Sequence, residues 1–227
     1  MGISKYGGQA AMSIIDHAIV RINKIDPDKP FVALTFDDGP SEHTTHILDT
    51  LHQYGARASF FVSGKNVSEH EGKILRASHM GCEVISHSWD HINMTTLSSR
   101  AIKKQLFESV AAIAKVTGKV SLMFRPPYGS INKRVEKVAL KLGLAIVNWS
   151  LDPNDWDTKD ADAIYTYIAN NVKNGDIILC HDVYDSTAEA MSRLIPELVE
   201  RECQLVTVSE LLLHVHKEIE PGKLYMC

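Results

Sequence analysis

The chain has 227 residues, 44% of them hydrophobic, so it can bury one substantial core and is expected to form a single α/β catalytic domain. Its net charge of −4 comes from acids and bases that are interspersed along the sequence, without the clustered basic runs that are typical of nucleic-acid-binding proteins. No apolar stretch reaches the length of about 18 residues that a membrane-spanning helix needs, and the N-terminus lacks the pattern of a secretory signal.

Short apolar runs alternate with segments of helical spacing through most of the chain. Before them, apolar residues between positions 11 and 22 predict an amphipathic helix, within an N-terminal helical extension that we place at residues 1–30. The region 31–213 is expected to form the catalytic domain, and residues 214–227 are assigned as a C-terminal tail. The apolar runs predict seven strands: Phe31 to Phe36, Ala58 to Val62, Cys82 to Ser86, Ser121 to Arg125, Leu144 to Ser150, Asp176 to His181, and Gln204 to Val208.

The segments between the runs have the spacing and the ends of helices. Ile102, Leu106 and Val110 recur one helical turn apart, and Ser68 with Glu71 has the spacing of a capping box. Glycine, which readily adopts the positive φ of a helix C-terminus, precedes the next strand after five helices: Gly55, Gly81, Gly118, Gly143 and Gly175. Regular alternation of strand and helix predicts a parallel sheet, either open and doubly wound or closed into a barrel.

Polar residues follow the strands at the positions where parallel α/β folds place their active sites. Five loops contribute ionisable groups, so they are expected to meet at one face of the sheet. The candidate residues are Asp37 and Asp38 after the first run, His87 and His91 after the third, Arg125 and Tyr128 after the fourth, Asp155 and Trp156 after the fifth, and Leu179 and His181 at the end of the sixth.

His87 and His91 lie four residues apart, so they can bind one metal ion together with a carboxylate from another strand. The adjacent carboxylates Asp37 and Asp38 favour this interpretation, because they repel each other unless a cation or an arginine compensates their charge. Alternatively, the aspartate pair forms only a helix cap and turn, or His43 replaces one of the ligands. The four cysteines form no C-x-x-C pair and are interpreted as buried free thiols rather than as a metal site.

A metal-activated water still needs a group that takes its proton, and a second aspartate held by Arg125 can do so. His181 is placed to protonate a leaving group, and Asp155 is the candidate partner that would raise its pKa, although it can equally be a turn residue. The backbone N–H of Tyr128 can face a developing oxyanion. Trp156 and Leu179 either line a pocket for an acetyl methyl group or pack in the core.

These residues, read in order, resemble the five motifs of the polysaccharide deacetylases of carbohydrate esterase family 4, the nodulation-type deacetylase homology domain, over residues 31 to 213. The resemblance implies that Asp37 is the general base, that Asp38, His87 and His91 bind the metal, and that Arg125 orients the base. It also implies that Asp155 pairs with His181 as the acid, that Tyr128 lies near the oxyanion, and that Trp156 and Leu179 line the acetyl pocket. The family fold is a distorted parallel (β/α) barrel, which agrees with about seven strand-helix units.

The resemblance further implies hydrolysis of N-acetyl groups in N-acetylglucosamine units of peptidoglycan or a chitin-like oligomer, with Zn²⁺ as the usual metal and Co²⁺, Ni²⁺ or Mn²⁺ as alternatives. It also favours a domain of an exported bacterial protein that acts at the cell surface, with a cytoplasmic location left open. Three other functions remain open. They are O-deacetylation of xylan, a catalytically silent carbohydrate-binding module, and a two-metal phosphoesterase, which would need more ligands. The sequence leaves the exact polymer and the oligomeric state undetermined.

Overall fold

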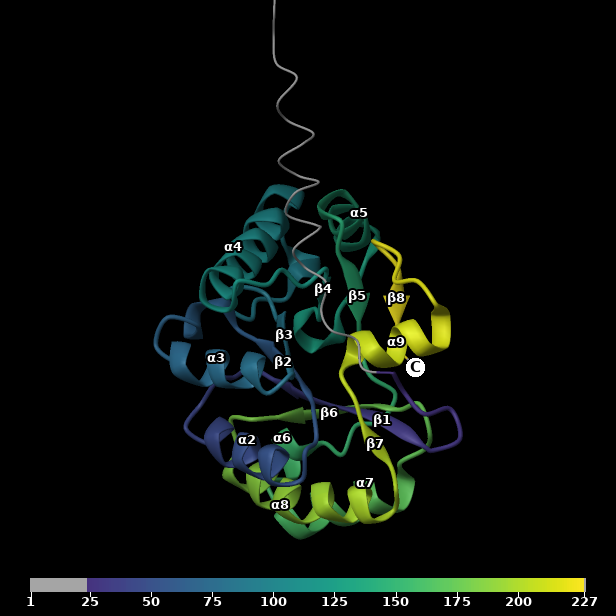
Figure 1. The fold of residues 1–227 in the computed structure, drawn as a ribbon. Helices are drawn as coiled ribbons and strands as arrows, with labels where there is room; N and C mark the ends of the chain where they lie inside the picture. The colour runs from purple at the N-terminus through teal and green to yellow at the C-terminus, as the bar shows by residue number, and fades with distance from the viewer. Residues whose placement is uncertain (1–23, 227) are drawn as a thin grey trace, which may run out of the picture.

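The computed structural model describes residues 24–226 and contains one parallel sheet that curves into an incomplete barrel (Figure 1). The strands follow the order β6-β1-β2-β3-β4-β5-β8, and β7 pairs with β1. After β5, Leu151 forms an isolated parallel bridge with Ile178 of β6, which brings the two sides of the barrel together. The strands are β1 (Phe31–Asp37), β2 (Ser59–Val62), β3 (Glu83–Ser86), β4 (Met123–Phe124), β5 (Ala145–Val147), β6 (Ile177–His181), β7 (Gln204–Leu205) and β8 (Leu224–Tyr225).

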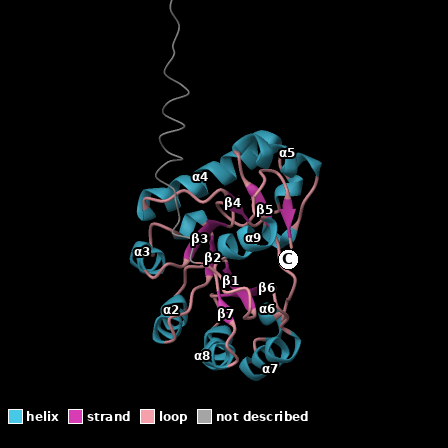
Figure 2. Ribbon diagram, turned by 45° about the vertical axis from the view of Figure 1, so that its right-hand side comes forward, coloured by secondary structure: helices cyan, strands magenta, loops and turns pink. Residues whose placement is uncertain are grey.

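Most of the helices lie on the outside of this curved sheet (Figure 2). They are α2 (Thr44–Gln53), α3 (Glu71–His79), α4 (Ser99–Thr117), α5 (Lys133–Leu142), α6 (Asp155–Thr158), α7 (Ala161–Asn171), α8 (Asp185–Glu200) and α9 (Val208–His216). None of the helices among residues 24–226 is long and apolar enough to cross a membrane. The predicted alternation of strand and helix is confirmed, and so is the distorted barrel that the family resemblance implied.

All seven predicted strands are present, and an eighth lies in the segment assigned as a tail, where β8 pairs with β5. The five glycines expected at helix ends all have positive φ. The capping box predicted at Ser68 and Glu71 is wrong, because α3 begins after His70 without a side-chain cap. A capping box instead starts α9, where Thr207 and Glu210 bond each other's backbone N–H. The helix predicted between positions 11 and 22 lies outside the described residues.

Successive side chains of a strand point to opposite faces of the sheet, which divides the core into layers. Along β1, Val32, Leu34 and Phe36 pack outward against the helices. The opposite faces of the strands pack inside the barrel, which α9 closes at one end with Val208, Leu211 and Leu212. Residues that pack inside are Phe31, Ala33, Phe61, Ile85, Met123, Ala145, Val147 and Ile177. This alternation decides which residues near the strand ends can face a common interior.

Candidate active site

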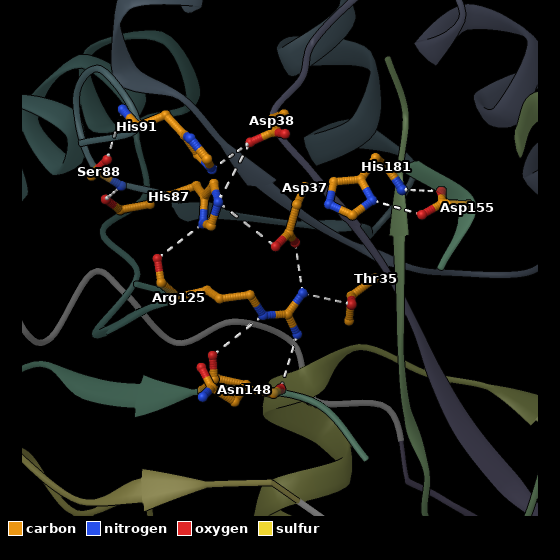
Figure 3. Close-up of polar contacts among 12 residues, drawn as sticks. Thr35, Asp37, Asp38, His87, Ser88, His91, Arg125, Asn148, Asp155 and His181 are labelled. Carbon is orange, nitrogen blue, oxygen red and sulfur yellow. Dashed lines mark hydrogen bonds and ion pairs between the residues drawn. The ribbon is translucent and has the colours of Figure 1, made fainter. Parts of the chain in front are cut away.

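The same alternation carries four of the predicted site residues into the barrel interior. Asp37, His87, Arg125 and His181 each follow an inward-facing core residue at an even spacing along its strand. Because all strands are parallel, their carboxyl ends meet at one end of the barrel. Figure 3 shows the result: Asp37 lies centrally, with the two histidines that follow β3 on one side and His181 on the other.

Asp38, His87 and His91 form a cluster whose potential ligand atoms all lie within 4.8 Å of one another. Oδ1 of Asp38 lies 3.2 Å from Nε2 of His91 and 3.5 Å from Nε2 of His87. Nδ1 of His87 lies 2.9 Å from the carbonyl oxygen of Arg125, which only accepts, so Nδ1 carries the proton and Nε2 presents its lone pair to the cluster.

Two further features show that this cluster suits a divalent cation. Burial lowers the pKa of His87 to about 3, so its ring is neutral, as a metal ligand must be. Oδ1 of Asp38 is buried and has no hydrogen-bond donor. Two neutral imidazoles and one carboxylate form a common three-residue donor set for catalytic zinc, which keeps an open position for water.

The loops that hold the cluster adopt backbone conformations that L-residues rarely occupy. Asp38, Ser88 and His91 have φ values of 74°, 67° and 63°. Side chains stabilise this path: Oγ of Ser88 accepts the N–H of His91 at 3.1 Å, and Oγ of Ser86 accepts the N–H of Ser88 at 3.2 Å. Strained backbone that its surroundings enforce is concentrated at functional sites, and here it aims the ligands at one point.

Beside the cluster, Asp37 forms a buried ion pair with Arg125. Nη1 of Arg125 lies 2.6 Å from Oδ1 of Asp37, and both side chains are almost completely inaccessible to solvent. The second oxygen, Oδ2, lies 3.8 Å from Nε2 of His87 and therefore faces the metal cluster. Burial raises the pKa of Asp37, and the Arg125 charge opposes this shift. The pair thus presents one carboxylate oxygen to the cluster while an arginine holds the other.

Arg125 is in turn held in place by contacts around its guanidinium group. Nη1 also donates to Oγ1 of Thr35 at 2.8 Å, Nη2 donates to the carbonyl of Asn148 at 3.0 Å, and Nε donates to the carbonyl of Val147 at 3.3 Å. The Phe61 ring packs 3.9 Å from the guanidinium carbon. These contacts compensate a charge that would otherwise be costly to bury, and they leave the guanidinium group a single orientation.

On the other side, His181 is held by Asp155. Nδ1 of His181 lies 2.7 Å from Oδ1 of Asp155, and the His181 backbone N–H donates to Oδ2 at 2.7 Å. Oγ1 of Thr187 donates to the same Oδ2 at 2.7 Å. Burial alone lowers the pKa of His181, but the hydrogen bond and charge of Asp155, together with the charges of Asp37 and Asp38, outweigh it and raise the pKa to about 9. His181 is therefore protonated at neutral pH, with Nε2 free to donate.

The residues predicted to contact the substrate differ in how far their side chains are exposed. Tyr128 is 66% exposed, has a φ of 61°, and places its ring edge-on to His91 with centroids 4.6 Å apart. Trp156 is 49% exposed, whereas Leu179 is buried and faces the barrel interior at the end of β6. The exposure of Trp156 contradicts simple core packing for this residue and suits an apolar contact with a ligand.

His43, the rival metal ligand, does not join the cluster. Its ring nitrogens lie 3.5 Å from Oδ1 of Asp185 and 3.6 Å from Oε1 of Glu42, near the start of α2. Among the residues that the structure describes, the only group of three or more histidine, cysteine or carboxylate side chains with metal-ligand spacing is the one formed by Asp38, His87 and His91. The described cysteines, Cys82, Cys180 and Cys203, are buried free thiols as expected.

Several supporting residues were not predicted from the sequence. Asp182 follows His181 and is buried. Its Oδ2 accepts the hydroxyl of Thr44, and its carboxyl group packs so closely against Gly39 that a Cβ there would lie 2.2 Å from Oδ1. Burial raises the pKa of Asp182 to about 7. Asp182 thereby connects the loop after β6 with the turn that follows Asp38. Thr187 was missed as well, because nothing in its local sequence indicates contact with Asp155.

Comparisons with known proteins bear on the whole of this site. A family model described as polysaccharide deacetylase matches residues 24–147. The peptidoglycan-N-acetylmuramic acid deacetylase PdaC of Bacillus subtilis is 37% identical over 199 residues, a match that covers 86% of this chain and 42% of the relative. The chain thus spans about two fifths of the length of that relative. A peptidoglycan-N-acetylglucosamine deacetylase of Bacillus cereus is 34% identical over 199 residues, covering 85% of this chain and 93% of the relative.

Solved structures of similar proteins share the fold over nearly the full described region. The structure of PdaC from Bacillus subtilis superposes with a TM-score of 0.79 at 37% identity, covering 82% of this chain and 92% of that one. A family 4 acetyl xylan esterase from Clostridium thermocellum, solved in complex with a cobalt ion, superposes with a TM-score of 0.80 at 33% identity, covering 86% of this chain and 97% of that one.

Proposed function

Because the chain belongs to the polysaccharide deacetylase family, we propose that it is a metal-dependent hydrolase that removes acetyl groups from N-acetylglucosamine units of peptidoglycan or of a chitin-like oligomer. The observation that carries this proposal is the buried Asp37–Arg125 pair directly beside the Asp38, His87 and His91 cluster. A site that only bound a metal would need the three ligands but not a second carboxylate held by an arginine.

We assign Asp38, His87 and His91 as the metal ligands. A divalent cation bound there, which we propose to be Zn²⁺, would supply a water with a pKa near 7 and polarise the acetyl carbonyl. Asp37 accepts the proton of the attacking water at Oδ2, the oxygen that faces the ligands. Arg125 orients Asp37 and stabilises its charged form.

The leaving amine needs a proton before the tetrahedral intermediate can collapse, and His181 holds one at neutral pH. Asp155 keeps Nδ1 protonated and directs Nε2 toward the reacting groups. The backbone N–H of Tyr128 donates to the oxyanion, and Trp156 with Leu179 contacts the acetyl methyl group. The positive φ of Tyr128 is consistent with a backbone shaped for this purpose.

O-deacetylation of xylan is the second candidate, favoured by the close structural match to the acetyl xylan esterase of Clostridium thermocellum. The chemistry is the same up to the leaving group, which is an alkoxide rather than an amine. Loop shapes around the cleft decide between the two polymers, so a direct comparison of substrates is needed.

The test is acetate release from N-acetylglucosamine oligomers, peptidoglycan and acetylxylan by protein freed of metal with a chelator, before and after addition of one equivalent of Zn²⁺. We expect zinc to restore release, with the N-acetylated polymers preferred. Asp37→Ala should bind zinc but release no acetate. If no polymer loses acetate although the chain binds one zinc ion tightly, the protein is a carbohydrate-binding module. Two tightly bound ions per chain would instead favour a two-metal phosphoesterase.

A further inference from the structure

A groove runs between the outer helices α4 and α5, at the top of the molecule in Figure 1. Its volume is about 890 Å³, and it lies over a core layer in which Ile102 and Leu106 of α4 pack with Val135 of α5. Most of its lining is polar or basic: Ser99, Arg100, Lys103, Asn132, Lys133, Arg134, Lys137, Val138, Lys141 and Leu142.

The charge of these two helices contrasts with that of the chain. They contain eight of the 24 Lys and Arg residues but only two of the 28 Asp and Glu residues, which gives them a net charge of +6. The chain as a whole carries −4, so all other residues together carry −10. Basic residues that are interspersed along the sequence are thus gathered in space by helix packing, so a positively charged groove lies on a molecule whose net charge is negative.

Most of the groove's positive charge has no partner. Arg100, Lys103, Lys137 and Lys141 form no ion pair or hydrogen bond within the described residues. The other two lining cations have partners: the ammonium group of Lys133 lies 3.0 Å from Glu136, and Arg134 donates a hydrogen bond to a backbone carbonyl. Like charges facing one another across a groove repel, and they are stabilised by an anion that lies between them.

The groove is connected to the loop that carries the metal ligand His91. Nη1 of Arg134 donates to the carbonyl of Leu97 at 2.8 Å, and Nδ2 of Asn132 donates to the carbonyl of Thr95 at 3.2 Å. Both helices begin just after loops at the carboxyl ends of β3 and β4, so the first turns of α4 and α5, which help to line the groove, lie on the side of the barrel that holds the candidate active site. A long polymer can therefore contact both places at once.

The shape and composition of the groove lining exclude some classes of binding partner. None of the lining residues is aromatic, so the groove lacks the stacking platforms with which single-stranded nucleic acids are bound. A concave channel with two apolar lining residues, Val138 and Leu142, also differs from the apolar face that a protein inserts into a bilayer. Several cations spaced along two helices instead match a linear chain with regularly repeated negative charges.

We propose that the α4–α5 groove binds a linear, phosphate-bearing polyanion that accompanies the acetylated polysaccharide, and so keeps the enzyme on its substrate. The link to the substrate rests on the proposed deacetylase function, whereas the binding itself does not. Both can be measured separately, so failure of one is distinguishable from failure of the other.

The probe is fluorescently labelled inorganic polyphosphate, titrated with metal-loaded protein and followed by anisotropy at several salt concentrations. Lys103→Gln with Lys137→Gln should weaken binding on the order of tenfold and reduce the slope of log Kd against log salt, because phosphate contacts are lost. The matched control is Lys173→Gln with Lys217→Gln, which removes the same charge from exposed positions elsewhere and should leave both quantities close to those of the unmodified chain. Neither pair should alter acetate release from a short N-acetylglucosamine oligomer.

Four outcomes would overturn the proposal. Equal weakening by both lysine pairs would mean that polyphosphate responds only to total charge. Tighter binding of a single-stranded oligonucleotide, lost in the groove variant, would assign the groove to nucleic acid. Tighter binding of vesicles with anionic lipids, lost in the same variant, would assign it to a membrane surface. Loss of short-oligomer activity in the groove variant alone would show that these lysines act on the active site instead.

Discussion

The carboxylate of Asp155 holds His181 by both its ring and its backbone: Oδ1 lies 2.7 Å from Nδ1, and Oδ2 accepts the backbone N–H at the same distance. Asp155 is itself completely buried and receives a third hydrogen bond from Thr187. The relationship fixes the position of the ring, its tautomer and its charge together. A histidine that is protonated at neutral pH is an acid, not a metal ligand, which separates His181 from His87 within one site.

The first prediction concerns the charge of His181. Asp155→Asn should lower its pKa from about 9, because burial continues to disfavour the imidazolium after the counter-charge is removed. The alkaline limb of the kcat profile should move to lower pH, and the ring titration followed by NMR in metal-free protein should move with it. Asp157→Asn, an exposed neighbour in α6, is the matched control and should change neither. An unchanged alkaline limb in Asp155→Asn would remove His181 from the role of acid.

The same substitution should alter stability with a defined sign. Since the folded pKa of His181 is raised above the unfolded value of about 6.5, the stabilisation is complete below pH ~6.5 and is lost as the pH rises through about 9. The difference in unfolding free energy between the unmodified chain and Asp155→Asn should therefore be largest near pH 6, decrease as the pH rises from about 6.5 to about 9, and level off above that. Urea unfolding at a series of pH values measures it.

The second prediction concerns the buried pair of Asp37 and Arg125. Arg125→Met should destabilise the chain by about 3–5 kcal/mol, because it leaves the Asp37 carboxylate buried without a counter-charge. Adding Asp37→Asn to Arg125→Met should recover part of the lost stability. In a double-mutant cycle measured by urea unfolding, the coupling free energy between the two substitutions should be about 1–3 kcal/mol. If the two single effects simply add, the pair contributes no specific interaction and the arginine has only a packing role.

The sequence predicted the fold and the convergence of the candidate site residues, but only where local pattern carries the information. Asp37, His87 and His181 follow strands whose apolar residues mark them clearly, so their arrival at one face could be inferred from parallel topology alone. Strand β8 has only two residues, Leu224 and Tyr225, and its strand conformation comes from pairing with β5 rather than from a pattern of its own.

Supporting contacts between distant segments could not be predicted in the same way. Thr187 lies 32 residues from Asp155, and Asp182 lies 138 residues from Thr44, so each pairing depends on how helices pack against the barrel. The basic groove is a similar case, because its cations come from two helices that only the packing of the fold brings side by side. Charge that is balanced along the chain is not necessarily balanced over a surface.

The third prediction concerns Asp182, whose pKa burial raises to about 7. A carboxyl group whose pKa is higher in the folded state than in the unfolded state does not destabilise the fold below its unfolded pKa of about 3.9. The free energy of unfolding then decreases as the pH rises through about 7. Asp182→Asn, which cannot ionise, should therefore gain stability relative to the unmodified chain between pH 4.5 and pH 8, by a few kcal/mol in order of magnitude. Urea unfolding of metal-free protein measures the difference. Asp28→Asn, at an exposed position, should show no such trend, and a flat difference for Asp182→Asn would mean that Asp182 stays ionised in the fold.

The fourth prediction separates the acid from the base. An amine is a poor leaving group until it is protonated, whereas the phenolate of an activated aryl acetate leaves without help. His181→Ala should therefore reduce kcat/KM for an N-acetylglucosamine oligomer by about 10²- to 10⁴-fold but reduce it for 4-nitrophenyl acetate by less than about tenfold. Asp37→Asn serves as the comparison, because loss of the base slows attack of water on both substrates alike. Equal losses on the two substrates in His181→Ala would mean that His181 acts before the leaving group departs, by orienting the water or stabilising the oxyanion, and the proton would then have to reach the amine from Asp37.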